Sequence, residues 1–362
     1  MNPELENQTL PFPAVPYASR PAPSLVSQDT VRFGVIGYGY WGPNVVRNLH
    51  GLEGACLSTI CDQSPNALKR AKQLYPSVAM TKDSADILAS PDIDAVAIVT
   101  PVWTHYDLAK RALENGKHVF LEKPLTSNVR QAEDLIELAD RKNLCLMVDH
   151  TFLFTGAVRK ISQLIDDGTL GDLYYYDSTR VNLGLFQHDI NVVWDLAPHD
   201  LSIMDHLIRE KPEALVATGE CHLNGHVDVA FITVYFPRNI IAHINVNWLS
   251  PVKVRTTLIG GEKKMLVWND LEADEKIKVY DKGVQITNQQ GVYDLLVSYR
   301  TGDMWSPKVE QAEALKVELG HFRESILKGK RPSNDGVAGL RVVKMLEAAD
   351  RSIREKGKAI LL

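Results

Sequence analysis

Residues 31–42 read VRFGVIGYGYWG, and this stretch decides the fold. Its first six residues are mostly apolar and β-branched, which predicts a short buried strand. Three glycines follow at the GxGxxG spacing, and residues 41–50 predict a helix. A strand, a glycine turn and a helix in this order present free backbone N–H groups to a pyrophosphate. The stretch therefore predicts a dinucleotide-binding unit, with a purely structural glycine turn as the alternative.

The three glycines have separate roles in such a turn. Gly37 permits the tight turn, and Gly39 lets phosphates approach the backbone because it has no Cβ atom. Gly42 lets the helix pack closely on the strand. The predicted cofactor-binding residues of the turn are Gly37, Tyr38, Gly39, Tyr40, Trp41 and Gly42.

Asp62 follows a second strand, which is predicted over residues 56–61. An acidic residue about 20 positions after the glycine turn accepts hydrogen bonds from the ribose hydroxyls of adenosine. Its carboxylate would also repel a 2′-phosphate. Gln63 and Ser64 come next, so no arginine stands there to receive that phosphate. These residues favour NAD over NADP as the cofactor.

Strand-like and helical segments alternate up to about residue 150. Further strands are predicted over 95–100, 117–121 and 144–148, and helices over 65–74, 104–115 and 128–142. Strands that alternate with helices of about 10–15 residues indicate βαβ units and a parallel sheet. Residues 31–150 are therefore predicted to form a doubly wound α/β domain of the Rossmann type.

The rest of the chain has a different rhythm. Helices are predicted over 157–167, 195–208, 310–327 and 337–355, and strands over 174–183, 215–221, 228–236, 240–248, 253–259 and 263–268. Consecutive strands without intervening helices indicate an antiparallel sheet. Residues 151–362 are therefore predicted to form a second α/β domain, whose last helix can pack on the Rossmann domain. Within its first strand, Tyr174, Tyr175 and Tyr176 alternate between faces, so at least one is expected in a core.

Six prolines within residues 1–30 argue against regular helix or sheet there. The segment also lacks the basic region and apolar run of a secretory signal. We expect a flexible or extended arm, which either has no function or embraces a second subunit.

Composition excludes several classes of partner. The chain has 362 residues, and its 40 basic and 45 acidic side chains give a net charge of -5. This balance leaves no basic footprint for nucleic acid or for anionic membranes. No apolar run is long enough for a transmembrane helix. The four cysteines are scattered and form no CxxC pair, which argues against a disulfide framework or a zinc site and favours a reducing cytoplasm.

Lys123 lies in the tripeptide Glu122-Lys123-Pro124, directly after the strand predicted over 117–121. Ligands of open parallel sheets bind beyond the carboxyl ends of the strands, where the nicotinamide is expected. There Lys123 can donate a hydrogen bond to a substrate hydroxyl and stabilise a developing oxyanion. The alternative is a solvated lysine in a loop. Pro124 fixes the local turn and is a candidate for a cis peptide bond.

Other residues at this edge belong to the same predicted cofactor site. Thr100 and Pro101 end the strand over 95–100, and His105 begins the following helix. Glu122 precedes the lysine. The predicted cofactor-side residues are therefore Thr100, Pro101, His105, Glu122 and Lys123, although a structural role for His105 is the alternative.

Asp195 and His199 are spaced i, i+4, so a helix would place both side chains on one face. A histidine beside a carboxylate is the usual general acid/base pair, because the carboxylate holds the tautomer and supports the imidazolium. Pro198 disturbs the helix, and a lone DxxxH spacing is also compatible with a structural role. The neighbouring Asp200, Asp205 and His206 lack a second ligand set, so no metal is predicted.

The substrate side is less determined by the sequence. His188 precedes the DxxxH segment and can reach a substrate, and Arg180 is a candidate for a substrate phosphate or carboxylate. Arg159, Lys253 and Arg255 are similar candidates, and a surface or structural role is the alternative for each of these residues.

Taken in order, the GxGxxG turn, Asp62, Thr100-Pro101, Glu122-Lys123-Pro124 and the DxxxH segment resemble the Gfo/Idh/MocA oxidoreductases, a family that includes glucose–fructose oxidoreductase and inositol dehydrogenase. The resemblance runs from about residue 31 to the end of the chain. It implies a Rossmann domain, a carboxy-terminal domain with a large, mostly antiparallel sheet that often forms the oligomer interface, and hydride transfer with NAD or NADP at a sugar or cyclitol carbon. It also implies that Lys123, Asp195 and His199 form the catalytic set.

The chain departs from the family pattern in one place. Residues 187–194 read QHDINVVW, where many members have a glycine-rich stretch. The segment is most similar to members that act on nucleotide-linked amino sugars or their uronic acids. This similarity makes a small carbohydrate or nucleotide sugar the expected substrate.

The resemblance thus implies a cytoplasmic, homo-oligomeric NAD-dependent sugar dehydrogenase, a dimer or a tetramer. The expected reaction moves a hydride between nicotinamide and C3 of a nucleotide-linked amino sugar or uronate, with His199 as base, Lys123 on the reacting oxygen and Asp195 orienting His199. Alternatives are an inositol or ketosugar dehydrogenase, an NAD-dependent glycosidase that works by oxidation and elimination, and an NAD-binding sensor without catalysis. The complete acid/base set counts against the sensor.

Overall fold

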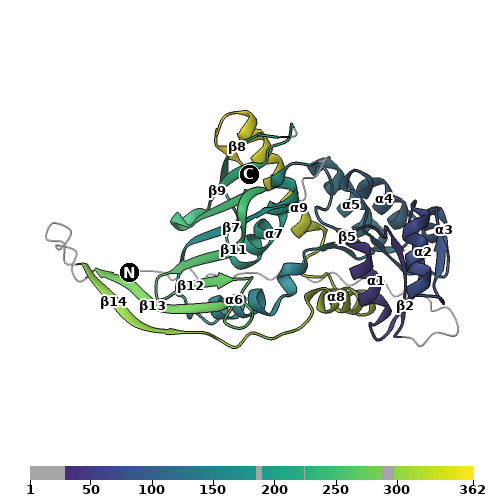
Figure 1. Ribbon diagram of the computed structural model, residues 1–362, viewed down its shortest axis with the longest axis horizontal. Coiled ribbons are helices and arrows are strands. Elements are labelled where there is room, and N and C mark those ends of the chain that lie inside the picture. Colours follow the sequence, from purple (N-terminus) through teal and green to yellow (C-terminus); the bar gives the residue numbers. More distant parts are fainter. Residues whose placement is uncertain (1–28, 185–189, 224, 287–296) are drawn as a thin grey trace, which may run out of the picture.

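The computed structural model describes residues 29–184, 190–223, 225–286 and 297–362. It contains two sheets, one in each half of the chain, which lie side by side (Figure 1). Almost all of the predicted arm over residues 1–30, and the whole of His188, lie outside the described residues. Within the described ranges, no helix combines the length and the apolar character needed to cross a membrane.

The first sheet is wholly parallel. Its six strands follow the order β3-β2-β1-β4-β5-β6, with every neighbouring pair parallel. The strands are β1 (Val31–Ile36), β2 (Ala55–Cys61), β3 (Ala79–Thr81), β4 (Ala95–Ile98), β5 (His118–Glu122) and β6 (Leu146–Asp149). The chain runs outward from β1 through β2 and then returns to the other side of β1 at β4. This reversal is the switch point beyond which such sheets bind ligands, and the predicted Rossmann class is confirmed.

Five α-helices lie among the described residues of this half, and polar side chains cap two of them. They are α1 (Gly42–His50), α2 (Pro65–Leu74), α3 (Ala85–Leu88), α4 (His105–Glu114) and α5 (Val129–Lys142). The side chains of Ser64 and Asn128 accept hydrogen bonds from backbone N–H groups in the first turns of α2 and α5. Asn143 ends α5 in the left-handed conformation at φ 53°. The predicted helices of this half are therefore confirmed.

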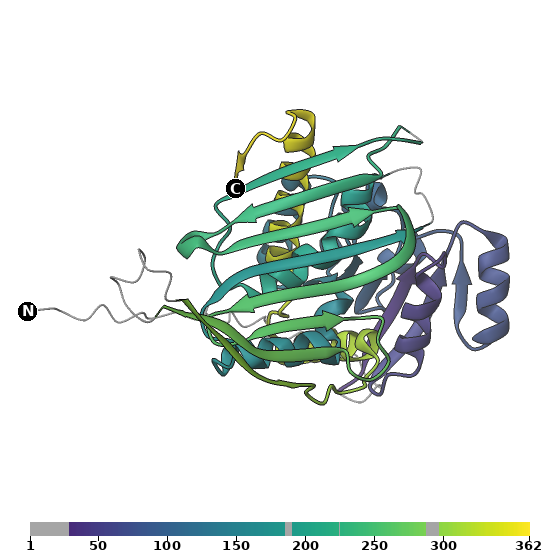
Figure 2. The same ribbon diagram turned by 60° about the vertical axis from the view of Figure 1, so that its left-hand side comes forward.

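The second sheet has nine strands in the order β14-β13-β12-β11-β7-β10-β9-β8-β15. All neighbours are antiparallel except β7 and β10, so the predicted mostly antiparallel sheet is confirmed. Figure 2 shows one broad face of this sheet free of helices and the helices gathered behind the other face. The strands are β7 (Leu173–Leu183), β8 (Ala214–Glu220), β9 (Val229–Tyr235), β10 (Ile241–Asn247), β11 (Leu249–Gly261), β12 (Met265–Asn269), β13 (Ile277–Ile286), β14 (Val297–Trp305) and β15 (Ile360–Leu361).

Of the three tyrosines at the start of β7, one packs in a core, as predicted. Tyr176 is buried, with 1% of its surface exposed, whereas Tyr174 is exposed. Behind the sheet lie α6 (Gly156–Asp166) and α7 (Val192–Leu207). Pro198 lies inside α7 and does not end it, and the helix begins three residues earlier than expected because the Asn191 side chain caps it.

The two last helices return to the Rossmann sheet. They are α8 (Ala314–Lys328) and α9 (Gly336–Arg354). Phe322 of α8 is fully buried, with its ring centroid 6.1 Å from that of Phe33 on β1 and 5.7 Å from that of Phe120 on β5. Between the helices, Asn334 accepts a backbone hydrogen bond from Val148 of β6 at 2.9 Å and returns one from its side chain at 2.6 Å. The end of the chain thus fixes the junction between the two halves.

Among the described α-helices and strands, five are not predicted from the sequence: β3, α3, β13, β14 and β15. β3, α3 and β15 span two to four residues, which is too short for a hydrophobic period to appear. β13 and β14 form a hairpin at one edge of the sheet, where polar residues such as Lys278, Asp281 and Asp303 interrupt the apolar pattern.

Candidate active site

The glycine turn after β1 has space for a cofactor at one position only. A Cβ atom on Gly37 would lie 2.2 Å from the carbonyl oxygen of Val99, and its φ is +103°. A Cβ atom on Gly42 would lie 2.3 Å from the carbonyl oxygen of Gly37. Around Gly39, by contrast, no described heavy atom lies within 4 Å of such a Cβ. Gly37 and Gly42 therefore allow close contacts between backbone segments, and Gly39 leaves open space at the surface of the turn.

The amino end of α1 is open to an anion. No side chain caps this end, and no acidic residue stands in the first turn. The positive dipole end of this helix therefore suits a phosphate. Tyr38 is buried, Tyr40 is 88% exposed, and the indole N–H of Trp41 donates to the Asp149 carboxylate at 2.8 Å. The open turn and the free helix end fit the pyrophosphate of a dinucleotide.

Asp62 lies beside the glycine turn, beyond the end of β2. One carboxylate oxygen accepts a hydrogen bond from the backbone N–H of Tyr38 at 2.6 Å, and the other accepts one from Ser64 at 2.7 Å. These bonds hold the carboxylate at the edge of the turn, where a ribose would lie. Gln63 donates to the carbonyl oxygen of Lys82 at 2.8 Å.

His105 is placed differently from the predicted cofactor contact. Its side chain is fully buried, and its two ring nitrogens lie 2.8 Å from the carbonyl oxygen of Thr100 and 3.0 Å from that of Pro124. Burial lowers the pKa of this imidazole. Because both nitrogens face backbone carbonyls, His105 links the loop after β4 to the loop after β5 and has no ring atom left for the cofactor. Thr100 itself shares a 2.6 Å hydroxyl contact with Thr104.

Lys123 and Asp195 meet across the junction between the two halves. The Lys123 ammonium donates to the backbone carbonyl of Asp195 at 2.7 Å and lies 3.6 Å from its carboxylate. The two side chains are only 13% and 19% exposed. The second carboxylate oxygen of Asp195 accepts a hydrogen bond from the buried indole of Trp248 at 3.1 Å. The loop after β5, where the Lys123–Pro124 peptide is cis, thereby contacts the first turn of α7.

His199 lies one turn further along α7. Its ring contacts that of Phe152 edge-on, with centroids 5.0 Å apart. Burial holds the pKa of His199 well below its ordinary value, and the positive charges of Lys123, Arg180 and Arg255 lower it further. The imidazole is therefore neutral at pH 7, and one of its ring nitrogens carries no proton.

The expected pairing of Asp195 with His199 does not occur in the structure. Among the described residues the Asp195 carboxylate contacts Lys123 and Trp248, and it makes no hydrogen bond to the His199 ring. Trp248 ends the strand predicted over 240–248 and donates its indole N–H, so it competes for the carboxylate. The spacing of Asp195 and His199 on a helix is correct, but the partner of the carboxylate is the lysine.

Glu122 belongs to a buried group of acids beneath the glycine turn. Its strand partner across the sheet is Asp149, and burial together with this neighbouring charge holds the pKa of Glu122 well above its ordinary value. Glu318 of α8 shares the environment, and its pKa is raised for the same reasons. Asp149 accepts hydrogen bonds from Trp41 and Thr151. Glu122 therefore faces inward and supports the turn through Asp149, a residue that the sequence analysis does not single out.

Arg180 has a structural partner. Its guanidinium is 6% exposed, and it donates to both carboxylate oxygens of Asp200 at 2.6 and 3.3 Å. Ser178 donates to the same carboxylate at 2.7 Å. These bonds occupy Arg180 in a buried ion pair, in place of the expected contact with substrate. Asp205 likewise pairs with Arg341, and within the described residues no cluster of three or more ligating side chains is arranged for a metal ion.

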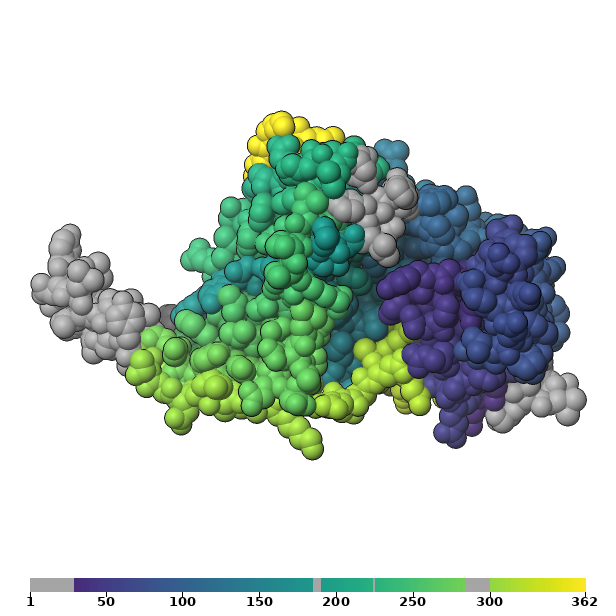
Figure 3. All heavy atoms as spheres, viewed as in Figure 1, coloured from purple at the N-terminus to yellow at the C-terminus, as the bar shows by residue number. Residues whose placement is uncertain are grey.

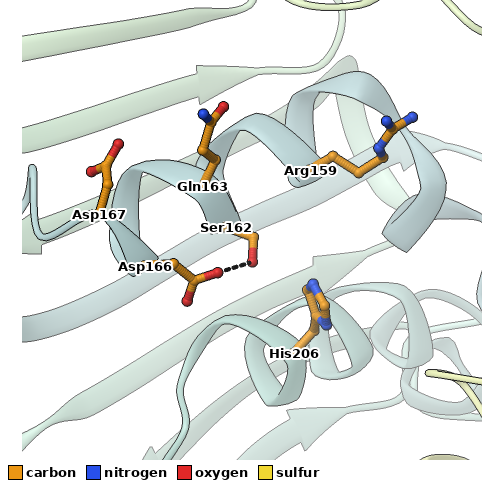
Figure 4. A pocket seen from close by; sticks show the side chains of 6 residues that line it. All are labelled: Arg159, Ser162, Gln163, Asp166, Asp167 and His206. Carbon is orange, nitrogen blue, oxygen red and sulfur yellow. Dashed lines mark hydrogen bonds between the residues drawn. The ribbon is translucent and has the colours of Figure 1, made fainter.

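Arg159 lies on α6 in a separate surface hollow. Figure 4 shows the hollow, which α6 and His206 of α7 line together. Arg159 forms an ion pair with Glu310 at 3.0 Å. Lys253 is exposed on β11. Of the four cationic candidates for an anion, only Arg255 remains near His199 and partly exposed, with 33% of its side chain accessible.

His150 shares an electrostatic environment with Lys123 and His199. It follows β6 and is 2% exposed, and neither ring nitrogen has a hydrogen-bond partner among the described residues. It lines a cavity of about 260 Å³ between α7, α9 and the loop before α9, together with Ser202, Asp205 and Arg341. Burial lowers the pKa of His150 to about 4.

An open glycine turn at the switch point of a Rossmann sheet, with a lysine and a neutral histidine beyond its strands, defines an oxidoreductase that uses a nicotinamide dinucleotide. Figure 3 shows the Rossmann half and the second sheet packed against each other. Residues 31–150 match the family model described as oxidoreductase family, NAD-binding Rossmann fold, and residues 158–267 match the GFO/IDH/MocA C-terminal domain. The chain belongs to the Gfo/Idh/MocA family of oxidoreductases.

Relatives of known name cover almost the whole chain. A myo-inositol 2-dehydrogenase of Thermotoga maritima is 24% identical over 350 residues, which are 90% of this chain and 97% of the relative. A UDP-N-acetylglucosamine 3-dehydrogenase of Acidithiobacillus ferrooxidans is 26% identical over 323 residues, which are 86% and 94% of the two chains. A solved structure of a UDP-N-acetylglucosamine 3-dehydrogenase from Acidithiobacillus ferrooxidans superposes with a TM-score of 0.75 at 23% identity and covers 90% of this chain and 98% of that one.

Proposed function

We propose that this protein is an NAD-dependent dehydrogenase that oxidises C3 of a nucleotide-linked amino sugar or its uronate. The observation that carries the proposal is the contact of Lys123 with Asp195 across the domain junction, with the neutral imidazole of His199 one helical turn away. The similarity to a UDP-N-acetylglucosamine 3-dehydrogenase over 86% of the chain supports the choice of substrate.

His199, Lys123 and Asp195 have separate roles in the proposed reaction. NAD, when bound, supplies the acceptor for the hydride. His199 takes the proton of the substrate hydroxyl, since burial and three nearby cations keep its ring neutral. Lys123 donates a hydrogen bond to the same oxygen and stabilises its developing negative charge. Asp195 positions Lys123, because its carboxylate and its backbone carbonyl both face that ammonium.

The cofactor preference follows from Asp62. Its carboxylate is held at the edge of the glycine turn by two backbone N–H groups, where it accepts bonds from ribose hydroxyls and opposes a 2′-phosphate. We expect NAD to bind more tightly than NADP in a fluorescence titration, and Asp62→Ala to reduce the difference. Tighter binding of NADP by the unmodified protein would contradict this part of the proposal.

The catalytic assignment is tested by His199→Gln with UDP-N-acetylglucosamine and its uronate as substrates. Loss of a general base is expected to lower kcat about 10²–10⁴-fold while NAD affinity stays unchanged. His206→Gln is the matched control, because His206 lies on the same helix but faces the surface hollow on α6. Unimpaired NADH formation by His199→Gln would remove this residue from the role of base.

A second candidate function is the oxidation of an inositol. The similarity to a myo-inositol 2-dehydrogenase over 90% of the chain favours it. Turnover of myo-inositol with no turnover of either UDP-linked sugar would select this candidate. Steady cleavage of a glycoside without net NADH would instead indicate oxidation followed by elimination.

We also propose that the protein is a cytoplasmic homo-oligomer joined through the second sheet. The face of this sheet that carries no helices exposes Phe231, Tyr235 and Ile241 to about 40% each. An apolar face of this kind favours self-association. Light scattering coupled to size exclusion tests this, and a monomer at micromolar concentration would contradict it.

A further inference from the structure

Two arginines face each other across neighbouring strands of the second sheet. Arg180 on β7 and Arg255 on β11 are direct partners in the antiparallel register. Both guanidinium groups lie against the ring of Phe152, at 4.5 Å and 5.6 Å from its centroid. Like charges directly opposite each other are unfavourable in a sheet unless counter-charges compensate them. The counter-charges of the two arginines therefore decide what each of them can bind.

Arg180 is fully compensated. It is buried, and Asp200 receives two of its N–H groups. Arg255 is compensated only in part, because a single N–H donates to Asp270 at 3.3 Å. Asp270 also faces Lys276, whose ammonium lies 4.0 Å from its carboxylate and donates to its backbone carbonyl. A guanidinium carries five N–H donors, so among the described residues Arg255 has most of its donors unused.

Arg255 also lies near the proposed centre of reaction. The Phe152 ring on which it stacks contacts the His199 ring edge-on at 5.0 Å. Its charge is among those that lower the pKa of His199, which places both groups in one electrostatic environment. A sugar bound at His199 would therefore lie in the electrostatic field of Arg255.

We propose that Arg255 binds an oxyanion of the substrate, and that this contact sets the preference of the enzyme for negatively charged sugars. The planar guanidinium fork matches a carboxylate or a phosphate in two parallel hydrogen bonds. The anion is either the carboxylate of a uronic acid or the diphosphate of a nucleotide linkage, which present the same acceptor oxygens. The inference rests on the proposed function, since it names a group of the substrate of that same site.

The proposal is tested by calorimetric binding to the NAD-loaded protein. UDP-glucuronate and UDP-glucose differ by the carboxylate, and UDP-glucose and glucose differ by the nucleotide diphosphate. Arg255→Gln is expected to weaken the binding of UDP-glucuronate about 10- to 100-fold. Arg255→Lys is expected to restore part of the affinity, because a lysine keeps the charge but loses the fork.

Lys253→Gln is the matched control, since this exposed residue lies on the same strand and the change removes the same formal charge. A loss confined to UDP-glucuronate supports the carboxylate as the bound group, and an equal loss for both UDP-sugars supports the diphosphate. Unchanged binding of both UDP-sugars by Arg255→Gln, or an equal loss in Lys253→Gln, would overturn the proposal. Thermal midpoints of all variants exclude unfolding as the cause.

Binding and turnover, measured separately, distinguish a failure of this inference from a failure of the proposed function. Arg255-dependent binding of the anionic probe without NADH formation on any sugar would leave the anion site in place and defeat the dehydrogenase. Turnover of neutral polyols, with kcat and KM unaffected by Arg255→Gln and no measurable preference for the anionic probes, would defeat the anion site alone.

Discussion

His150 provides a pH-dependent contribution to stability whose size follows from the structure. The side chain is 2% exposed, and both ring nitrogens lack hydrogen-bond partners. Burial is the main reason why the pKa falls to about 4, and the charges of Arg341 and Lys123 lower it while Asp149 opposes them. In the unfolded chain the ordinary value of about 6.5 applies. The folded protein therefore accepts a proton at this site less readily than the unfolded chain.

The sign and the magnitude follow from this difference. A histidine whose pKa is lowered by folding costs no free energy of unfolding at a pH above its unfolded pKa. Stability is lost as the pH falls from about 6.5 toward about 4. A tenfold difference in proton affinity corresponds to about 1.4 kcal/mol, so the full loss is about 3 kcal/mol. At pH 5, where the site is protonated in the unfolded chain and mostly neutral in the folded protein, the loss is about 2 kcal/mol.

The assay compares urea unfolding at pH 7 and pH 5. Replacing His150 by phenylalanine removes the titrating group, and the adjoining cavity of about 260 Å³ leaves room for the larger ring. We expect His150→Phe to lose about 2 kcal/mol less than the unmodified protein between the two pH values. The other buried histidines are present in both proteins, and His50→Gln, on the exposed end of α1, is the control. Equal losses in the unmodified protein and His150→Phe would refute the reasoning.

Three further predictions concern the two loops and the helix of the site. Gly39→Ala should leave the thermal midpoint unchanged and weaken NAD binding at least about 10-fold, because its Cβ would occupy only the space above the turn. Gly42→Ala should lower the thermal midpoint as well, since its Cβ would lie 2.3 Å from a backbone oxygen. Asp200→Ala should cost about 3–5 kcal/mol in urea unfolding, because it leaves a buried guanidinium unpaired. Asp195→Ala and Lys123→Met should each lower kcat. If the carboxylate acts through the ammonium, the double variant should be no slower than Lys123→Met. Additive losses in the double variant would contradict that role.

The Rossmann half could be predicted from the sequence because its signals are local. A buried strand, the glycine turn and Asp62 follow each other within 32 residues, and each has a fixed place in such a unit. Capping by Ser64 and Asn128 also places the starts of α2 and α5 within one residue. The order of the nine-stranded sheet could not be obtained in this way. The parallel pairing of β7 with β10 joins segments more than 60 residues apart, and no local pattern records it.

The positions of the candidate site residues follow from the sequence, whereas their partners do not. Lys123 follows directly from the strand before it, whereas its partner carboxylate comes from a helix 72 residues later. His105 has the signals of a cofactor contact, yet burial turns both ring nitrogens toward backbone carbonyls. Arg180 and Arg255 look alike in the sequence, and only the structure shows that Asp200 pairs with Arg180.

Helical spacing decides which face a side chain occupies, but competition among neighbours decides its partner. Asp195 and His199 share a face of α7, as their spacing requires, yet a buried indole from the sheet and an ammonium from the Rossmann half both approach the carboxylate. His199 is left with the edge of Phe152 and stays neutral among cations. Within one turn of α7, Asp195 therefore contacts a lysine of the first domain, and His199 contacts an aromatic ring of the second. Because Phe322 of α8 packs against the rings of Phe33 and Phe120 of the Rossmann half, the distance between Lys123 and Phe152 depends on the packing of the domain junction as well as on α7.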